Sequence, residues 1–133
     1  STSWKSLKHK KVLLVEDNMI NQFLASTILK NWKMRVEVAE NGLIAIEKLK
    51  SQNFDVVLMD MQMPVMGGIE ATSIIRGDLK SSIPIIALTA RALKGVDKEC
   101  MEAGMNDYIS KPFNQSELFN KILNAINYGT ETI

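Results

Sequence analysis

The sequence predicts an α/β fold built on one parallel sheet, and two patterns predict it. Short apolar runs, typical of strands buried on both faces, alternate along the chain with segments whose apolar residues recur at helical spacing. Strands that alternate with helices form a parallel sheet with right-handed crossovers and helices on both faces. The 133 residues hold five strand–helix pairs, (βα)5, which is the size of one ordinary domain.

Residues 1–10 are polar and basic, and we expect them to form a tail or linker. His9 has no carboxylate or metal-ligand partner nearby in sequence, so we interpret it as an exposed histidine rather than a ligand or phospho-acceptor. The apolar run that follows, Lys11-Val-Leu-Leu-Val, predicts the first strand. Two adjacent acids, Glu16 and Asp17, stand at its carboxyl end.

A helix is expected over residues 19–31, with Asn18 as its N-cap. Its apolar residues cover more than one face, which is usual for a well-buried helix. Met19 and Phe23 lie near the acidic tip of the first strand, where a docking patch is the alternative, but we expect them to be buried. The main stripe at helical spacing consists of Ile20, Phe23, Leu24, Thr27 and Ile28.

The central strand is the apolar run at 56–59, and Asp60 stands at its carboxyl end. Before it, the alternating residues 35–39 predict a short second strand, and Asn41-Gly42 turns into a second helix. A carboxylate at a strand end is held on a rigid element and still meets solvent, which suits a reactive group. Taken alone, Asp60 is explained equally well as a turn residue that ends the strand.

The second half of the chain repeats the pattern. Gly67 is a tolerable N-cap for a third helix, and the run at 85–90 predicts a fourth strand whose tip carries the hydroxyl of Thr89. A helix over about 96–103 ends at Gly104, a natural residue to follow a helix.

The last strand is expected at 108–113, with Lys111 at its tip, and Asn114 caps the final helix. We place the folded domain at 11–128 and a C-terminal tail at 129–133.

Parallel strands bring all of these tips to one edge of the sheet. That edge collects three acids, a hydroxyl and a cation: Glu16, Asp17, Asp60, Thr89 and Lys111. Two carboxylates ~4 Å apart repel by roughly 4 kcal/mol at an effective dielectric of about 20, so three together require a counter-ion. Oxygen ligands without Cys or His favour Mg²⁺ over zinc.

Magnesium and phosphate chemistry go together at such a site. Asp60 is then a carboxylate nucleophile that attacks an activated phosphoryl group. Mg²⁺ and Lys111 offset charge on the phosphoryl oxygens, and Thr89 donates a hydrogen bond to one of them. The expected product is an aspartyl phosphate.

Composition excludes several other classes. Sixteen basic and fifteen acidic residues give a net charge of +1 without a polybasic run, so we expect no binding of nucleic acid or of a membrane surface. No apolar run approaches the ~20 residues of a membrane helix. The single cysteine, Cys100, excludes an internal disulfide, fits a reducing cytosol and is expected in the core.

Five motifs in this order resemble the receiver domain of two-component response regulators, most closely the receivers of hybrid sensor histidine kinases. They cover roughly residues 11–127: Val-Leu-Leu-Val-Glu-Asp-Asn, Asn41-Gly42, Val-Val-Leu-Met-Asp-Met-Gln-Met-Pro-Val-Met-Gly-Gly, Ile-Pro-Ile-Ile-Ala-Leu-Thr-Ala, and Ala-Gly-Met-Asn-Asp-Tyr-Ile-Ser-Lys-Pro-Phe. The resemblance implies a flavodoxin-like doubly wound sheet with strand order 2-1-3-4-5.

The resemblance also assigns roles to residues. It implies Asp60 as phospho-acceptor, Asp17 and Asp60 as ligands of Mg²⁺, the backbone carbonyl of Gln62 as a further ligand, and Glu16 as a residue that reaches the metal directly or through water. Thr89 would be the switch hydroxyl, and Tyr108 the aromatic residue that turns with it. Lys111 would face the phosphate, after a cis peptide bond to Pro112.

In function, the resemblance implies a signalling domain rather than a separate enzyme. It would take phosphate from the phosphohistidine of a sensor histidine kinase, then switch conformation or pass the phosphate to a histidine phosphotransfer domain. A cytoplasmic location is expected, either as a stand-alone regulator or as the soluble part of a membrane-anchored hybrid kinase.

Two other functions remain open at this stage. Haloacid-dehalogenase-type phosphatases use a similar set of residues, but they need a second Asp where this chain has Gln62. A receiver that only binds partners is the other alternative, and the intact set of site residues argues against it.

Gln62 and Arg91 follow Asp60 and Thr89 by two residues, at positions that in receivers flank the path of the hydrolytic water. Arg91 could obstruct in-line attack, whereas Gln62 could orient the water. Alternatively, both are solvated loop residues. We expect obstruction to win, because a relay domain must keep its phosphate long enough to pass it on.

Overall fold

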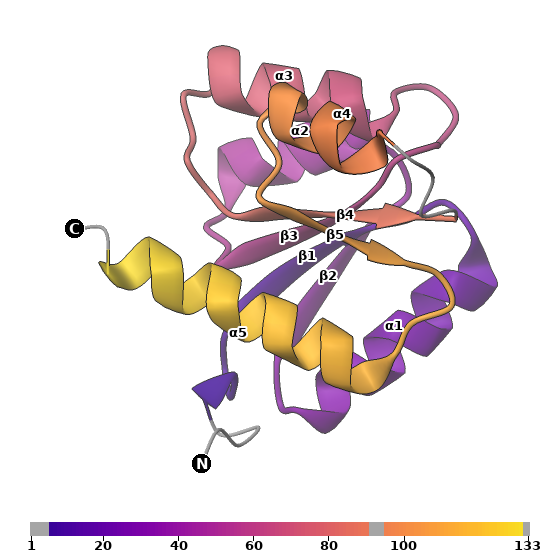
Figure 1. The fold of residues 1–133 in the computed structure, drawn as a ribbon, viewed down its shortest axis with the longest axis vertical. Helices are drawn as coiled ribbons and strands as arrows, with labels where there is room; N and C mark the ends of the chain where they lie inside the picture. The colour runs from indigo at the N-terminus through magenta and orange to yellow at the C-terminus, as the bar shows by residue number, and fades with distance from the viewer. Residues whose placement is uncertain (1–5, 91–94, 132–133) are drawn as a thin grey trace.

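A five-stranded parallel sheet forms the centre of the fold (Figure 1). The computed structural model describes residues 6–90 and 95–131. The strand order is β2-β1-β3-β4-β5, which confirms the predicted doubly wound topology. The strands are β1 (Lys11–Val15), β2 (Arg35–Ala39), β3 (Val56–Asp60), β4 (Ile85–Thr89) and β5 (Asp107–Ser110).

Helices cover both faces of the sheet, with α1 and α5 on one face and α2, α3 and α4 on the other (Figure 1). Asparagine side chains cap three of them, because Asn18, Asn41 and Asn114 accept hydrogen bonds from backbone N–H groups in the first turn. The helices are α1 (Met19–Asn31), α2 (Gly42–Ser51), α3 (Gly68–Gly77), α4 (Val96–Ala103) and α5 (Gln115–Glu131).

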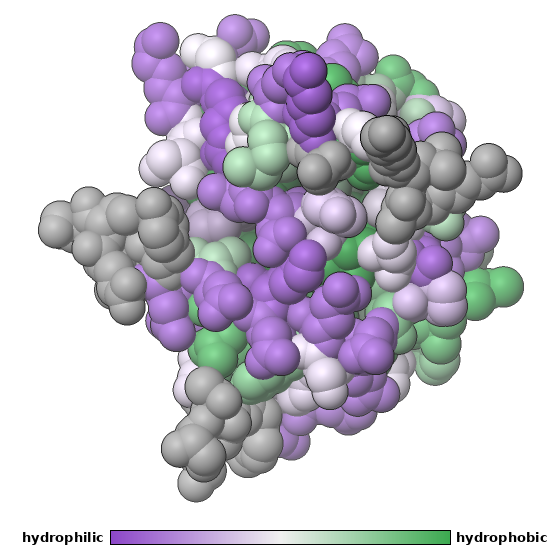
Figure 2. Space-filling model, in the orientation of Figure 1, coloured by the Kyte–Doolittle hydropathy of each residue, from purple (hydrophilic) through white to green (hydrophobic). Residues whose placement is uncertain are grey.

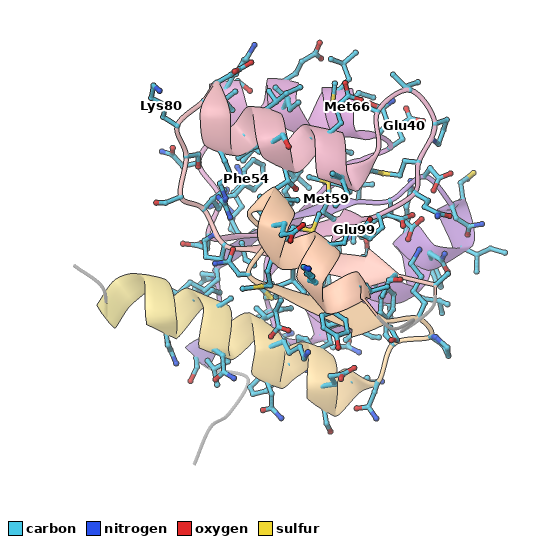
Figure 3. All side chains as sticks on the ribbon, turned by 45° about the horizontal axis from the view of Figure 1, so that its top comes forward. Glu40, Phe54, Met59, Met66, Lys80 and Glu99 are labelled. Carbon is cyan, nitrogen blue, oxygen red and sulfur yellow. The ribbon has the colours of Figure 1, made fainter. Side chains whose placement is uncertain are left out.

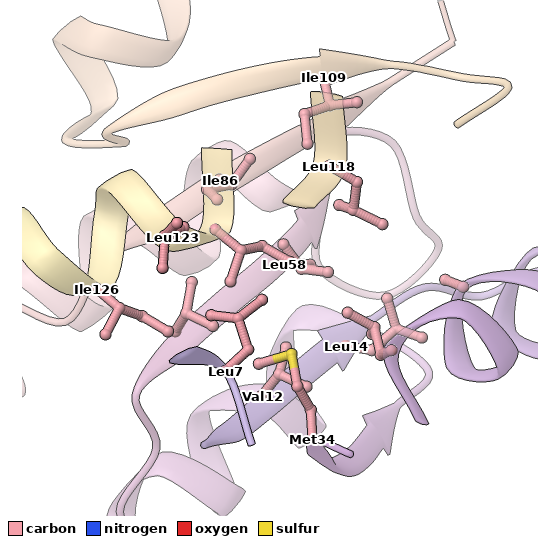
Figure 4. Packing of buried hydrophobic residues seen from close by; sticks show 14 of the residues in the cluster. Leu7, Val12, Leu14, Met34, Leu58, Ile86, Ile109, Leu118, Leu123 and Ile126 are labelled. Atoms are coloured by element: carbon pink, nitrogen blue, oxygen red, sulfur yellow. The ribbon is translucent and has the colours of Figure 1, made fainter. Parts of the chain in front are cut away.

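The core consists of two apolar layers, one on each face of the sheet. Every residue of β3 and β4 is buried, as expected for central strands of a parallel sheet. On one face, Leu58 and Ile86 pack against Leu118 and Leu123 of α5 (Figure 4). Cys100 is fully buried in the layer on the other face, as predicted.

Residues 6–10 are not a separate tail. Leu7 is fully buried in the layer beneath α5, where Figure 4 shows it beside Val12 and Met34. The backbone N–H of His9 donates to the carbonyl of Lys33, which fixes this segment at the start of β1. His9 itself is exposed, as expected. At the other end, α5 continues to Glu131, past the start of the expected C-terminal tail.

The buried face of α1 was predicted wrongly. Ala25 and Leu29 point into the core, whereas most of the stripe expected to be buried is exposed, and only Ile28 of that stripe packs partly against the core. Phe23 is 71% exposed, together with Met19, Ile20 and Leu24. The reason is that α1 carries apolar residues on more than one face, so periodicity cannot select its inner face. The contacts of Gln22 and of the N-cap Asn18 with Glu16 turn the helix instead.

The carboxyl ends of the strands lie along one edge of the domain. Figure 3 shows Glu40, which follows β2 at this edge, on the opposite side of the molecule from Lys80, which lies in the loop leading to β4. Among the described residues, no helix combines the length and the apolar character needed to cross a membrane.

Candidate functional site

Three carboxylates come together at the carboxyl edge of the sheet, as predicted. Glu16 and Asp17 follow β1, and Asp60 ends β3, which is paired with β1 in the sheet. One oxygen from each carboxylate lies within 4.8 Å of the others. Glu16 and Asp60 are buried, with 1% and 6% exposure, whereas Asp17 is exposed. The cluster is therefore open to solvent on the side of Asp17.

Glu16 is held in place by its own chain. Its backbone N–H donates to the carbonyl of Ala39 on β2, at 3.0 Å. Its carbonyl accepts from Nε2 of Gln22 at 2.6 Å, and its Oε2 accepts from the backbone N–H of Asn18 at 3.1 Å. The first turn of α1 thus fixes both the backbone and the carboxylate of Glu16.

Lys111 brings a cation into the acidic cluster from the segment after β5. Its Nζ lies 2.6 Å from Oε1 of Glu16 and 3.3 Å from Oδ2 of Asp60. The peptide bond between Lys111 and Pro112 is cis, as predicted. The backbone N–H of Lys111 donates to the carbonyl of Thr89 at 2.7 Å, so the ends of β4 and β5 are tied together at the site.

The electrostatics of the cluster shift the pKa values of Glu16 and Asp60 in opposite directions. Burial, and then the negative charge of Glu16, raise the pKa of Asp60 from 3.8 to about 6. Burial also acts to raise the pKa of Glu16, but the hydrogen bonds from Lys111 and from the Asn18 N–H outweigh it and lower that pKa. Glu16 therefore keeps its charge more readily than Asp60 does.

The loop after β3 folds back beneath Asp60. The backbone N–H of Gln62 donates to Oδ1 of Asp60 at 3.3 Å, and the side chain of Gln62 is exposed. The loop returns so closely that a Cβ atom on Gly68 would lie 2.5 Å from the carbonyl oxygen of Asp60. Only glycine fits this approach, and it lets the start of α3 pack directly under the end of β3.

A cleft of about 580 Å³ opens over Asp60. It brings together four predicted site residues, Asp60, Gln62, Thr89 and Lys111, and two residues from α4 that sequence reasoning missed, Val96 and Glu99. Because α4 is the next element of the chain after β4, the order of the elements could have indicated them. The other lining residues are Met61 and Ala90.

Among the described residues, Glu16, Asp17 and Tyr108 are predicted site residues that do not line this cleft. Tyr108 is half-buried on β5, where it pairs with Ala87, two residues before Thr89 on the neighbouring strand. Since alternate residues of a strand share a face, Tyr108 and Thr89 lie on the same side of the sheet. Arg91 lies outside the described residues.

The donor set fits a hard divalent cation. Asp17, Glu16 and Asp60 offer only oxygen atoms, and the solvent-facing side of the cluster leaves room for water and a phosphoryl oxygen. The pKa of Asp60 stays raised, through burial and then the charge of Glu16, although the ammonium group of Lys111 acts to lower it. A second positive charge would therefore be favourable here.

Comparison with known proteins identifies the family. The family model described as the response regulator receiver domain matches residues 12–123. The chain belongs to this receiver family. The predicted resemblance is thereby confirmed, and so is the placement of the domain in two-component signalling.

Curated relatives are long sensor kinases. The receiver is 47% identical over 113 residues to the autoinducer 2 sensor kinase/phosphatase LuxQ of Vibrio vulnificus, covering 85% of this chain and 13% of that protein. It is 43% identical over 116 residues to hybrid signal transduction histidine kinase M of Dictyostelium discoideum, covering 82% and 5%. The chain thus spans a small part of either relative, and hybrid kinases are among its relatives, as predicted.

Solved receivers share the fold. One is the receiver domain of sensor histidine kinase PA1611 from Pseudomonas aeruginosa, which has a magnesium ion in its active-site cleft. It gives a TM-score of 0.81 and 40% identity, and the match covers 90% of this chain and 98% of that one. Another is the receiver domain of Ssk1 in complex with the histidine phosphotransfer protein Ypd1 from Saccharomyces cerevisiae. It gives a TM-score of 0.86 and 32% identity, with 92% of each chain covered.

Proposed function

We propose that this receiver accepts a phosphoryl group from a phosphohistidine onto Asp60. The observation that carries the proposal is the meeting of Asp60 with two further acids and with Lys111, beside a cleft that Asp60 and Lys111 line. An oxygen of Asp60 attacks phosphorus, the phosphorus–nitrogen bond breaks, and the imidazole leaves with the electron pair of that bond. With a pKa of about 6, Asp60 is largely ionised at pH 7 and is available as the nucleophile.

The surrounding groups stabilise charge during this transfer. Asp17, Asp60 and the backbone carbonyl of Gln62 would hold Mg²⁺, with Glu16 acting directly or through water, and the ion would offset charge on the phosphoryl oxygens. Lys111 is already 3.3 Å from Asp60 and supplies a second positive charge. The hydroxyl of Thr89, at the end of the adjacent strand, would donate to one phosphoryl oxygen.

The new charge would act as a switch. Thr89 moves toward the phosphoryl group, and Tyr108, on the same face of the sheet, turns into the space that Thr89 leaves. Gln62 and Arg91 are proposed to set the lifetime of the aspartyl phosphate, with Gln62 orienting the hydrolytic water and Arg91 obstructing its approach.

The phosphate would be exchanged with a kinase or with a histidine phosphotransfer domain. A histidine that reaches Asp60 must cover the edge of the sheet, and the N-terminal half of α1 forms part of that edge. Its four exposed apolar residues, which we call the α1 patch, are Met19, Ile20, Phe23 and Leu24. Figure 2 shows apolar surface there, at the right-hand side of the molecule.

The chemistry of the α1 patch fits an apolar helical partner. α1 carries no charged residue before Lys30, so the patch offers contact area without a charge pattern. A helix of the partner that displays its histidine beside apolar side chains would cover the patch and reach Asp60 together. The solved Ypd1–Ssk1 complex, which pairs a phosphotransfer protein with a receiver, supports this kind of partner. Since phosphohistidine is made from ATP, the exchange would occur in the cytoplasm.

Incubation with acetyl phosphate and Mg²⁺, followed by intact-mass spectrometry, tests the acceptor. We expect the mass of one phosphoryl group to be added to the wild type, and no addition in Asp60→Asn or in the presence of EDTA. Asp78→Asn, an exposed acid at the end of α3, is the matched control and should be labelled normally. Labelling of Asp60→Asn at the wild-type level would refute the assignment, and rapid release of phosphate without an adduct would indicate a phosphatase.

A further inference from the structure

Tyr108 is held by a lysine from a different part of the chain. The Nζ of Lys121, on α5, donates to the carbonyl oxygen of Tyr108 at 2.7 Å and lies 5.0 Å from the centre of its ring. The same Nζ donates to Oδ1 of Asp107 at 2.9 Å, and this oxygen also accepts from the N–H of Tyr108 at 2.8 Å. One ion pair therefore contacts the backbone of Tyr108 on both sides and its aromatic ring.

The topology of the sheet makes this contact possible. β5 is an edge strand, and Ile109 points into the layer beneath α5, so the neighbouring Tyr108 points to the opposite face. Lys121 starts from α5 and reaches past the open edge of β5 to the ring. Its side chain is 24% exposed and lines a groove that also includes Met101 of α4.

The ring contact depends on the orientation of Tyr108. An ammonium group is attracted to the face of an aromatic ring, and the attraction falls when the ring turns away. In the structure the ring lies beside Lys121, while Thr89 lines the cleft over Asp60. A ring that turned toward Thr89 would give up this contact, whereas the bond from Lys121 to the backbone carbonyl would remain.

We propose that Lys121 is a positioning residue that holds the ring of Tyr108 in its resting orientation and so sets how readily the receiver switches. The inference rests on the proposed switching of Thr89 and Tyr108. A contact made in only one of two states shifts the balance between them by its own strength. For a cation over a partly exposed ring this is about two- to fivefold, which corresponds to about 0.5–1 kcal/mol.

Lys121→Met tests the proposal, because methionine keeps much of the side-chain length and removes the charge. The protein is labelled with 3-fluorotyrosine, and the ¹⁹F resonance of Tyr108 is assigned with Tyr128→Phe. Beryllofluoride with Mg²⁺ serves as the phosphoryl mimic. In Lys121→Met we expect the resting resonance to move toward its beryllofluoride-bound position. The midpoint of the beryllofluoride titration should fall about two- to fivefold.

Lys48→Met is the matched control. Lys48 pairs with Glu37 at 3.1 Å, and the side chains are 28% and 35% exposed, close to the 24% and 40% of Lys121 and Asp107. This control should leave both the resonance and the midpoint unchanged. Lys121→Arg retains a cation that can lie over the ring and should behave nearly as the wild type does.

Asp107→Asn separates the ring contact from the ion pair. It removes the negative charge and leaves the ammonium group near the ring, so we expect a smaller shift of the midpoint than in Lys121→Met. If Asp107→Asn shifts the midpoint as much as Lys121→Met does, the effect comes from the ion pair, and the proposed role of the contact between Lys121 and the Tyr108 ring is refuted.

Two failures can be told apart. If the wild-type Tyr108 resonance does not respond to beryllofluoride, the proposed switch is wrong and the role of Lys121 falls with it. If the wild type responds and Lys121→Met has the same resonance position and midpoint, the switch stands and the role of Lys121 is refuted.

Discussion

The ammonium group of Lys111 lies closer to Glu16 than to the proposed acceptor: its Nζ is 2.6 Å from Oε1 of Glu16 and 3.3 Å from Oδ2 of Asp60. Glu16 is therefore more than a peripheral acid at a metal site. It holds the cation at the mouth of the cleft, and its charge contributes to the raised pKa of Asp60. Changing Glu16 should affect the metal, the cation and the acceptor together.

Glu16→Gln should weaken Mg²⁺ binding by about tenfold, because a buried negative charge beside the metal is lost. It should also lower the pKa of Asp60, since the repulsion from Glu16 disappears and Lys111 is freed to pair with Asp60. Calorimetry with Mg²⁺ and a pH titration of the Asp60 carboxyl by NMR measure the two effects. Glu40→Gln, an exposed acid after β2, is the control and should change neither.

Mg²⁺ affinity should depend on pH through Asp60. Below a pH of about 6 a proton occupies its carboxylate, so Mg²⁺ must displace that proton and its apparent Kd rises as the pH falls. Above that pH the Kd should be nearly constant. Titrations with Mg²⁺ between pH 5 and pH 8 check this, and a Kd that is flat across the range would contradict it.

The same pKa has a consequence for stability without metal. The folded-state pKa of Asp60 is about 6, above its ordinary value of 3.8, so the folded state binds more protons than the unfolded state between these values. The contribution of Asp60 to the free energy of unfolding should therefore decrease as the pH rises from about 4 to about 6, by up to about 3 kcal/mol. Urea unfolding in EDTA should reveal this term in the wild type. The term should be absent in Asp60→Asn.

Phe23→Asp should slow phosphotransfer from a phosphorylated histidine phosphotransfer domain by about tenfold or more, because it places a charge in the centre of the α1 patch. Labelling by acetyl phosphate should stay at the wild-type rate, since a small donor does not need the patch. Leu43→Asp makes the same kind of change at an exposed residue on α2, on the opposite face of the sheet. If both variants slow transfer equally, the α1 patch is not the docking surface.

Salt provides an independent check of the α1 patch. An interface made by uncharged apolar residues should lose little affinity when the salt concentration is raised. Binding of the wild-type receiver to the phosphotransfer domain, measured by calorimetry at two salt concentrations, should therefore change little. A steep decrease would mean that charges outside the patch dominate.

Arg91→Ala should shorten the half-life of the aspartyl phosphate several-fold, because the proposed obstacle to in-line attack by water is removed. Acceptance from a donor should be largely intact. Release of phosphate from purified phosphoprotein measures the half-life, with Arg35→Ala, an exposed arginine on β2, as the control. An unchanged or longer half-life would remove Arg91 from the mechanism.

The strands and the site could be predicted from the sequence because both follow from local patterns. A fully apolar run is typical of a strand buried on both faces of a parallel sheet. Because parallel strands end at the same edge of the sheet, Asp60 and the acids after β1 were expected to lie together, as they do. The inner face of α1 could not be predicted in this way. Its apolar residues lie on more than one face, and the choice depends on the hydrogen bond from the Gln22 side chain to the carbonyl of Glu16, which precedes the helix.

Contacts between distant elements were out of reach for a similar reason. Nothing in the spacing of Lys121 and Tyr108 indicates that a lysine would cross the sheet edge to lie over the tyrosine ring. The order of the elements places α4 near the cleft, but it does not indicate that Glu99 rather than another residue of α4 lines it. Such placements are set by tertiary packing, and single-sequence patterns carry little information about them.

The buried side chain of Leu7 limits how far the N-terminus of this domain can be shortened. Because its side chain fills the layer beneath α5, a shortened version that starts at Lys11 would leave a hole beside Val12 and Met34 rather than remove a dispensable extension. Loss of a large buried side chain typically lowers the free energy of unfolding by about 2–5 kcal/mol, which is roughly a third of the stability of an ordinary domain. Any segment joined ahead of residue 6 is thus attached to the α1–α5 side of the sheet through the Leu7 side chain and the backbone hydrogen bond from His9 to Lys33. A force on that segment would be transmitted through Leu7 to the apolar layer that lies between the sheet and the helices α1 and α5.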